Sequence, residues 1–223
     1  MGKAQIASIR LAAALLGALL VAGTAVCAEA ADRVTAAAVW RPAPGFMERF
    51  HRQCDGRAGK EFDACFAAAM ARAGASPSAL AVTRRLGNEA YLESLDETLG
   101  PVAVAHVFYP FRANENDAWL LVNGAPPLID VDDRRYLDLA ALRSTPAYAA
   151  IRRHYPHVSF WPGDRGAAAP QIGRNGRAFV VGYLLRDLCH ACATIGHVRF
   201  AFEFDGAGKF LGTRLISVVA APR

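Results

Sequence analysis

The chain has 223 residues, a formal net charge of +5, and 53% hydrophobic residues. A chain of this size buries about 70% of its unfolded surface, so it can form a hydrophobic core without depending on disulfides. Its arginines are dispersed along the sequence. The charge therefore argues against a nucleic-acid partner and supports only a mild attraction to anionic surfaces.

Residues 1–30 have the layout of a secretory signal peptide. Lys3 and Arg10 give a positive start, an unbroken apolar run follows, and small residues lead up to Ala30. The apolar run is shorter than the roughly 20 residues that cross a bilayer, so we expect no transmembrane anchor. Cleavage is expected after Ala28 or Ala30, and the cut after Ala30 would remove one lysine, one arginine and one glutamate and leave a net charge of +4.

Cys27 lies at the end of the apolar run and raises the question of lipid attachment. The preceding residues 24–26, Thr-Ala-Val, are a poor version of the Leu-Ala-Gly that usually precedes a lipidated cysteine. We therefore expect ordinary cleavage and release into the periplasm or the medium. In that oxidising compartment the remaining cysteines are expected to form disulfides. They are Cys54, Cys65, Cys189 and Cys192.

The first half of the mature chain has mainly a helical pattern. Residues 31–44 are rich in Ala and Pro and show no period, so they are expected to form an extended leader. Residues 88–99 carry an apolar stripe at helical spacing and are expected to form a helix that ends at Gly100-Pro101. Three earlier helices are expected over residues 46–54, 62–73 and 77–87.

From Val102 onward the apolar residues alternate, which is typical of strands. The first expected strand, residues 102–109, is apolar on both sides, as in an interior strand. Residues 162–176 contain two Asn/Gly-type breaks and are expected to form a loop. The remaining expectations before residue 162 are strands over 118–122 and 157–161, a brief apolar run over 128–131, and helices over 138–142 and 146–154.

The C-terminal residues predict a meander of three strands, over 179–188, 197–204 and 210–219. Four apolar side chains on one face of the middle strand, at positions 198, 200, 202 and 204, each contribute roughly 1.5–3 kcal/mol when buried. The predicted fold class is α+β in a single domain over 45–223. A helical cluster, residues 45–100, packs on an antiparallel sheet, residues 101–223.

Cys54 and Cys65 lie on the apolar stripes of two consecutive predicted helices. A bond between them would clip a helical hairpin and contribute about 3 kcal/mol through loop-closure entropy. Four cysteines allow three pairings, so a cross-link between the helical part and the sheet part stays open.

The segment Cys189–Cys192, with the sequence CHAC, permits several interpretations. Thiol–disulfide exchange uses a cysteine at a helix N-terminus, but a strand pattern follows here. Covalent haem requires a histidine where Ala193 stands. A metal site with His190 and His197 competes with disulfide formation in an oxidising compartment. We expect a small disulfide that tightens the connection between two strands, with redox chemistry as an alternative.

The densest polar group lies beside the end of the first predicted strand. Loops that flank a rigid sheet often carry binding groups, so we expect contact with a partner here. The members of this group are Tyr109, Arg112, Asn114, Glu115, Asn116 and Asp117.

The other candidates for chemistry favour structural roles. His106 lies in mid-strand among apolar neighbours, where a hydrogen-bonded core histidine is more usual than a catalytic base. The carboxylates within 115–117 and 130–133 lack the regular spacing of a twelve-residue calcium loop. The short motifs of the common hydrolases and nucleotide-binding proteins are missing from the sequence. We therefore expect no catalytic residue, no metal and no cofactor.

Three segments of the chain are similar to a set of uncharacterised exported proteins from proteobacteria. These segments are residues 110–116 (PFRANEN), residues 128–133 (LIDVDD) and Cys189–Cys192. The resemblance covers most of the mature chain. It implies no activity, cofactor or catalytic residue.

Export, modest positive charge and paired cysteines favour a non-enzymatic module that binds an unidentified protein or envelope component. One alternative is a thiol–disulfide redox protein that uses Cys189 and Cys192. Another is a hydrolase that acts on envelope material through His106 and nearby loop carboxylates. The sequence gives no oligomeric state.

Overall fold

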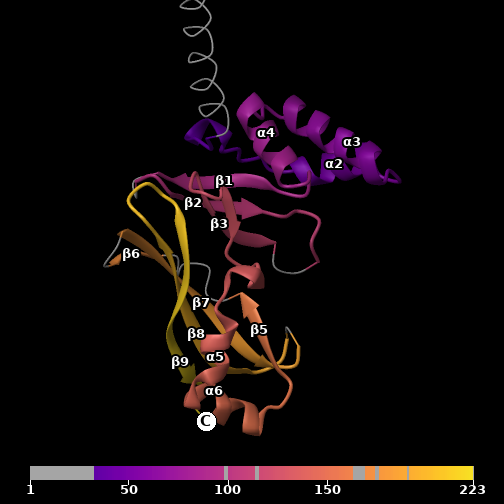
Figure 1. Ribbon diagram of the computed structural model, residues 1–223. Coiled ribbons are helices and arrows are strands. Elements are labelled where there is room, and N and C mark those ends of the chain that lie inside the picture. Colours follow the sequence, from indigo (N-terminus) through magenta and orange to yellow (C-terminus); the bar gives the residue numbers. More distant parts are fainter. Residues whose placement is uncertain are drawn as a thin grey trace, which may run out of the picture. The chain divides into compact units, whose positions relative to one another are not determined.

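Two antiparallel sheets, with helices before each of them in the sequence, make up the computed structural model (Figure 1). The structure describes residues 33–97, 100–113, 116–162, 169–173, 176–189 and 191–222. These residues belong almost entirely to one compact unit, Val34–Arg223. The predicted signal peptide, Cys27, Asn114, Glu115 and His190 lie outside the described residues. Among the described residues, no helix combines the length and the apolar character needed to span a membrane.

The N-terminal helices surround an aromatic core. The Phe50 side chain is 1% exposed. Its ring lies 5.3–6.3 Å from the rings of Phe46, Phe62, Phe66 and Phe111. The elements of this region are η1 (Ala36–Ala38), α2 (Phe46–Cys54), α3 (Gly59–Arg72) and α4 (Pro77–Arg85), which confirms the three helices expected here.

Residues 33–44 pack into the core although their sequence shows no period. Val34, Ala38 and Trp40 are only 3%, 1% and 6% exposed. The Asn123 side chain accepts a hydrogen bond from the Val34 N–H at 2.7 Å and donates one to the Val34 carbonyl at 2.8 Å. The described part of the expected extended leader is therefore anchored to the fold.

The first sheet has the strand order β1-β2-β3-β4 and is antiparallel throughout. The helix expected over residues 88–99 is wrong, because Tyr91–Asp96 forms β1. The strand contains a β-bulge: Leu92 pairs with Val107 and Ser94 pairs with His106, so Glu93 between them is an extra residue. The extra residue interrupts the alternation that would have indicated a strand. The other strands are β2 (Ala103–Phe108), β3 (Asp117–Val122) and β4 (Leu128–Asp130).

The second sheet has the order β5-β7-β8-β9, and β6 also pairs with β7. It contains the predicted C-terminal meander, and its four core positions on β8 are at most 2% exposed. One sheet was expected after residue 101, and the structure has two. The strands are β5 (Val158–Pro162), β6 (Ala169–Gly173), β7 (Gly176–Asp187), β8 (Thr194–Phe204) and β9 (Phe210–Ala220).

The expected loop over residues 162–176 is interrupted by β6, which returns along β7 through antiparallel pairing. The helical elements η2 (Arg134–Tyr136), α5 (Leu139–Ser144) and α6 (Pro146–His154) lie between the two sheets in the sequence, and α5 and α6 contact β9. The α+β class is therefore confirmed, with helices in two places along the chain.

One hydrophobic core joins the two sheets. Val104 and Leu121 of the first sheet belong to the same buried cluster as Phe179 and Phe204 of the second. The backbones also meet outside this cluster. A Cβ atom on Gly124 would lie 2.8 Å from the Gly208 carbonyl oxygen, so this close approach requires glycine.

Candidate functional site

Some side chains of the polar loop that is predicted to contact a partner form hydrogen bonds within the loop itself. The Asn116 side chain donates hydrogen bonds to the carbonyls of Tyr109, at 2.8 Å, and Arg112, at 2.7 Å. The Arg112 guanidinium lies 3.4 Å above the Tyr109 ring, a cation–π contact. Asp117, the last residue of the predicted contact loop, faces His106 on the sheet. Contact with a partner through this loop stays a prediction.

The carboxylates of residues 130–133 support local turns. Asp130 accepts a hydrogen bond from the Asp132 N–H at 2.9 Å, and Asp133 forms an ion pair with Arg135 at 2.6 Å. Burial raises the pKa of the Asp130 carboxyl, and the Asp132 N–H and the Arg112 charge partly oppose that shift. Asp130 and Asp133 thus each contact a residue of their own turn.

The two disulfides expected from the sequence are both present. Cys54–Cys65 joins α2 to α3, and its cysteines are 2% and 7% exposed. Cys189–Cys192 lies in the connection between β7 and β8. Because β8 begins at Thr194, no helix follows Cys192 to stabilise a thiolate. This placement argues against thiol–disulfide exchange.

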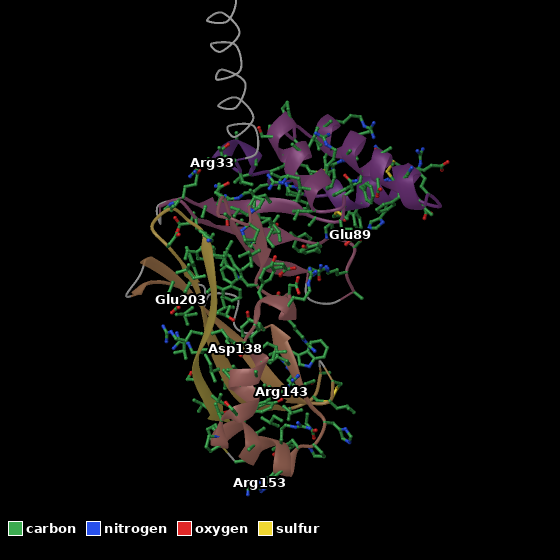
Figure 2. The ribbon with its side chains drawn as sticks, viewed as in Figure 1. Arg33, Glu89, Asp138, Arg143, Arg153 and Glu203 are labelled. Atoms are coloured by element: carbon green, nitrogen blue, oxygen red, sulfur yellow. A yellow bond between two sulfur atoms is a disulfide. The ribbon has the colours of Figure 1, made fainter. Side chains whose placement is uncertain are left out.

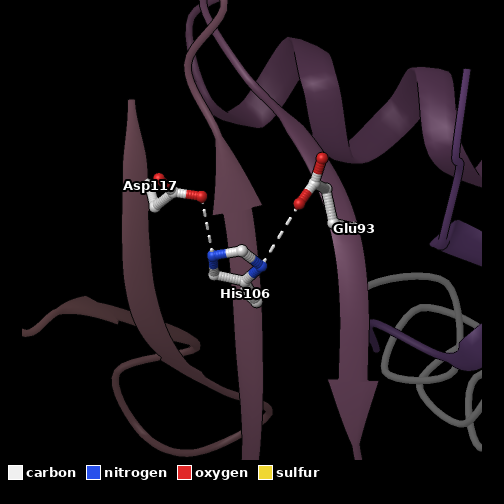
Figure 3. A group of neighbouring side chains, drawn as sticks. All are labelled: Glu93, His106 and Asp117. Carbon is white, nitrogen blue, oxygen red and sulfur yellow. Dashed lines mark ion pairs between the residues drawn. The ribbon is translucent and has the colours of Figure 1, made fainter. Parts of the chain in front are cut away.

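Three side chains from neighbouring strands converge on one face of the first sheet (Figure 3). His106 of β2 lies between Glu93 of β1 and Asp117 of β3. Its Nδ1 is 3.3 Å from a Glu93 carboxylate oxygen, and its Nε2 is 3.2 Å from a carboxylate oxygen of Asp117. We call Glu93, His106 and Asp117 the histidine cluster.

Strand register explains how the histidine cluster forms. In β1 the bulge adds Glu93 between the residues that pair with Val107 and His106. In β3, Asp117 pairs with Phe108, two residues along β2 from His106 and therefore on the same side of the sheet. The cluster thus depends on one irregular strand pairing and one regular pairing.

The cluster combines partial exposure with close packing. The side chains of His106, Glu93 and Asp117 are 19%, 32% and 20% exposed, so water reaches them. The Trp119 ring packs against the imidazole with centroids 4.8 Å apart. Burial and then the charges of Glu93 and Asp117 raise the pKa of Tyr91 to about 12.

No protein family, curated protein or solved structure matches this chain. The function is therefore inferred from its own residues.

The histidine cluster permits two chemical states. Only a doubly protonated imidazole can donate to both carboxylates at once. A neutral imidazole can instead donate from one nitrogen and bind a metal ion through the other. Glu93, His106 and Asp117 each offer one ligand atom, and these atoms lie within 4.8 Å of one another.

Two members of the histidine cluster, His106 and Asp117, are candidates from the sequence, and the third, Glu93, is not. The sequence favours a hydrogen-bonded strand histidine for His106 and places Asp117 in the contact loop, and only the hydrolase alternative joins His106 to nearby loop carboxylates. The alternating pattern of β2 and β3 was a signal that could have joined His106 and Asp117. It places Asp117 opposite Phe108, whose side chain lies on the same face of the sheet as that of His106. Glu93 was missed because residues 88–99 were expected to be helical.

Proposed function

We propose that this chain is an exported, disulfide-stabilised binding protein whose ligand is a divalent transition-metal ion at the histidine cluster. The observation that carries the proposal is one imidazole between two carboxylates on adjacent strands, at 3.3 and 3.2 Å. The strands fix the backbone of each donor, so ion binding requires only side-chain adjustment.

The ion is proposed to bind His106 Nε2 and Asp117. Zinc bonds to nitrogen and oxygen are about 2.0–2.2 Å long, so tetrahedral ligand atoms lie about 3.4 Å apart. The present separation of Nε2 and the Asp117 oxygen, 3.2 Å, is close to that value. Glu93 then accepts a hydrogen bond from Nδ1–H, the carboxylate–histidine–metal arrangement that orients a ligand ring. Water completes the coordination, because the side chains are partly exposed.

The donor set favours Zn²⁺. Imidazole suits Zn²⁺ and its transition-metal neighbours, whereas Ca²⁺ and Mg²⁺ prefer sites made of oxygen ligands alone. Zn²⁺ also keeps one oxidation state, which suits an oxidising compartment. Calcium and magnesium therefore serve as comparison ions.

Export is supported by the leader sequence and by the two disulfides. Membership of the exported proteobacterial family that the chain resembles is part of the same proposal. Intact mass of the protein from a periplasmic fraction tests it. A mature chain starting at Glu29 or Ala31 is expected, and full-length cytosolic protein with free thiols would contradict export.

Calorimetric titration of chelator-treated protein with Zn²⁺, Ca²⁺ and Mg²⁺ tests the metal site. His106→Gln and Asp117→Asn each remove a direct ligand and should abolish zinc binding. Glu93→Gln should weaken it by about 10–100-fold, the usual cost of losing an orienting partner. His197→Gln is the matched control, because His197 is an exposed strand histidine outside the cluster. Circular dichroism checks that every variant is folded.

Any of three results would overturn the assignment of the metal to the histidine cluster. Wild-type protein that binds no zinc excludes the site, as does binding that survives His106→Gln. Loss of binding in His197→Gln alone would move the metal to the Cys189–Cys192 region. Tyr91 gives an independent readout, because bound Zn²⁺ offsets the carboxylate charges and should lower the pKa of Tyr91 from about 12.

A further inference from the structure

Three arginines from two helices line one hollow on the surface of α5 and α6. Arg143 belongs to α5, whereas Arg152 and Arg153 belong to α6, and Figure 2 labels Arg143 and Arg153 on these helices. The hollow has a volume of about 340 Å³, and Tyr148 and Pro156 complete much of its wall. We call Arg143, Arg152 and Arg153 the hollow arginines.

The charge of the hollow arginines is not compensated locally. The sequence contains no Asp or Glu from Leu139 to Gly163. Within the part of the chain that the structure describes, none of the three guanidiniums takes part in a hydrogen bond or an ion pair. Other arginines do have such partners: Arg135 pairs with Asp133 and Arg214 with Glu203.

Helix dipoles explain part of this arrangement. Each hollow arginine lies in the last turn of its helix, where a cation offsets the partial negative charge of the C-terminus. That effect accounts for an arginine at each helix end. The helix dipole does not explain why arginines from the ends of two different helices line the same hollow. Their position around one hollow therefore needs another explanation.

We infer that this hollow binds a phosphate-bearing anion. A guanidinium presents a planar set of donors that matches phosphate oxygens and remains charged at any physiological pH. Three of them around one hollow suit a multiply charged group, such as a diphosphate or closely spaced phosphate esters. The Tyr148 ring and Pro156 offer an apolar wall for the carbon part of the same molecule. The volume lies at the lower end of the range for small-molecule sites.

The phosphate can come from a soluble molecule or from the headgroups of an envelope lipid. The same guanidinium contacts serve both sources, and the net positive charge of the chain favours approach to either. The inference does not rest on the metal site, because it involves other residues and another ligand.

Titration with sodium pyrophosphate at low ionic strength, in the presence of a chelator, tests the soluble source. The chelator prevents a metal ion from bridging the probe to the histidine cluster. Arg143→Gln, Arg152→Gln and Arg153→Gln should each weaken binding by about tenfold, the loss of one charge-assisted contact. The matched control is Arg84→Gln, which removes an exposed arginine from the last turn of α4.

Sedimentation with phosphatidylglycerol vesicles tests the lipid source, with phosphatidylcholine vesicles as the uncharged comparison. Suppose that the protein binds the vesicles but not pyrophosphate, and that the hollow variants weaken vesicle binding more than Arg84→Gln does. This result supports the site and identifies the lipid headgroup as its ligand. Binding to pyrophosphate supports it with a soluble ligand. The inference is overturned if neither probe binds, or if Arg84→Gln weakens binding as much as the hollow variants do. Circular dichroism shows whether each variant is folded.

Discussion

Removal of each disulfide should destabilise the protein by an amount that increases with the logarithm of the length of the loop that it closes. The Cys54–Cys65 bond spans 11 residues of sequence and the Cys189–Cys192 bond spans 3. Loop-closure entropy predicts losses of about 3 kcal/mol for Cys54→Ala/Cys65→Ala and about 2 kcal/mol for Cys189→Ala/Cys192→Ala. Alanine is preferred to serine because Cys54 and Cys65 are buried, and burying a hydroxyl carries a desolvation cost.

Urea unfolding followed by circular dichroism measures both losses, and a thermal scan provides a second comparison. For a domain of this size the melting temperature should fall by about 6–12 °C in the first variant and about 4–8 °C in the second. A reductant should destabilise the wild type and leave the quadruple alanine variant unchanged. A greater loss from the Cys189–Cys192 variant would refute the argument from loop length.

Three further predictions concern single side chains. Phe50→Ala should cost about 3–5 kcal/mol of unfolding free energy, because the side chain is 1% exposed and surrounded by aromatic rings. Ser76→Ala should cost about 1 kcal/mol in the same measurement, because the Ser76 hydroxyl caps α4. Stability should fall as pH rises from about 10 to 12, because the fold holds Tyr91 protonated through burial and the charges of Glu93 and Asp117 while the unfolded chain releases the proton.

Matched variants separate these effects from general damage. Phe50→Leu should cost less than Phe50→Ala, and a loss below about 1 kcal/mol for Phe50→Ala would contradict its core position. Ser78→Ala lies in the same helix without capping it, and equal losses at Ser76 and Ser78 would argue against the cap. Tyr91→Phe should reduce the alkaline loss of stability, and an unchanged pH profile would contradict the role of Tyr91.

Regular patterns in the sequence predicted much of the fold. The helical stripes of the N-terminal region and the alternation in β8 arise because one face of each element is buried. Burial of one face gives a regular spacing of apolar residues in the sequence. The pairs Cys54–Cys65 and Cys189–Cys192 are the ones expected, although the sequence left a cross-link between the helical part and the sheet part open. The division into two sheets gives no such regular spacing, because it depends on packing between strands far apart in the chain.

The histidine cluster was harder to predict because its third member depends on an irregularity. Because of the bulge, Leu92 and Leu95 pack in the same cluster although they are three residues apart. In the sequence alone, apolar residues three apart indicate a helix. The hollow arginines were visible only as dispersed charges. Their convergence depends on how α5 and α6 lie together, which residue order alone does not specify.

Glu93, the extra residue in β1, contributes to the proposed metal site but is not needed for the pairing of β1 with β2. In a chain without Glu93, β1 would pair with β2 without a bulge. Leu92 and Leu95 would stay on the side of the sheet where they lie now. A single codon gained or lost would thus add or remove the carboxylate that orients His106 while leaving the scaffold whole. Such a site can arise late in the history of a protein and vanish again without endangering its folding.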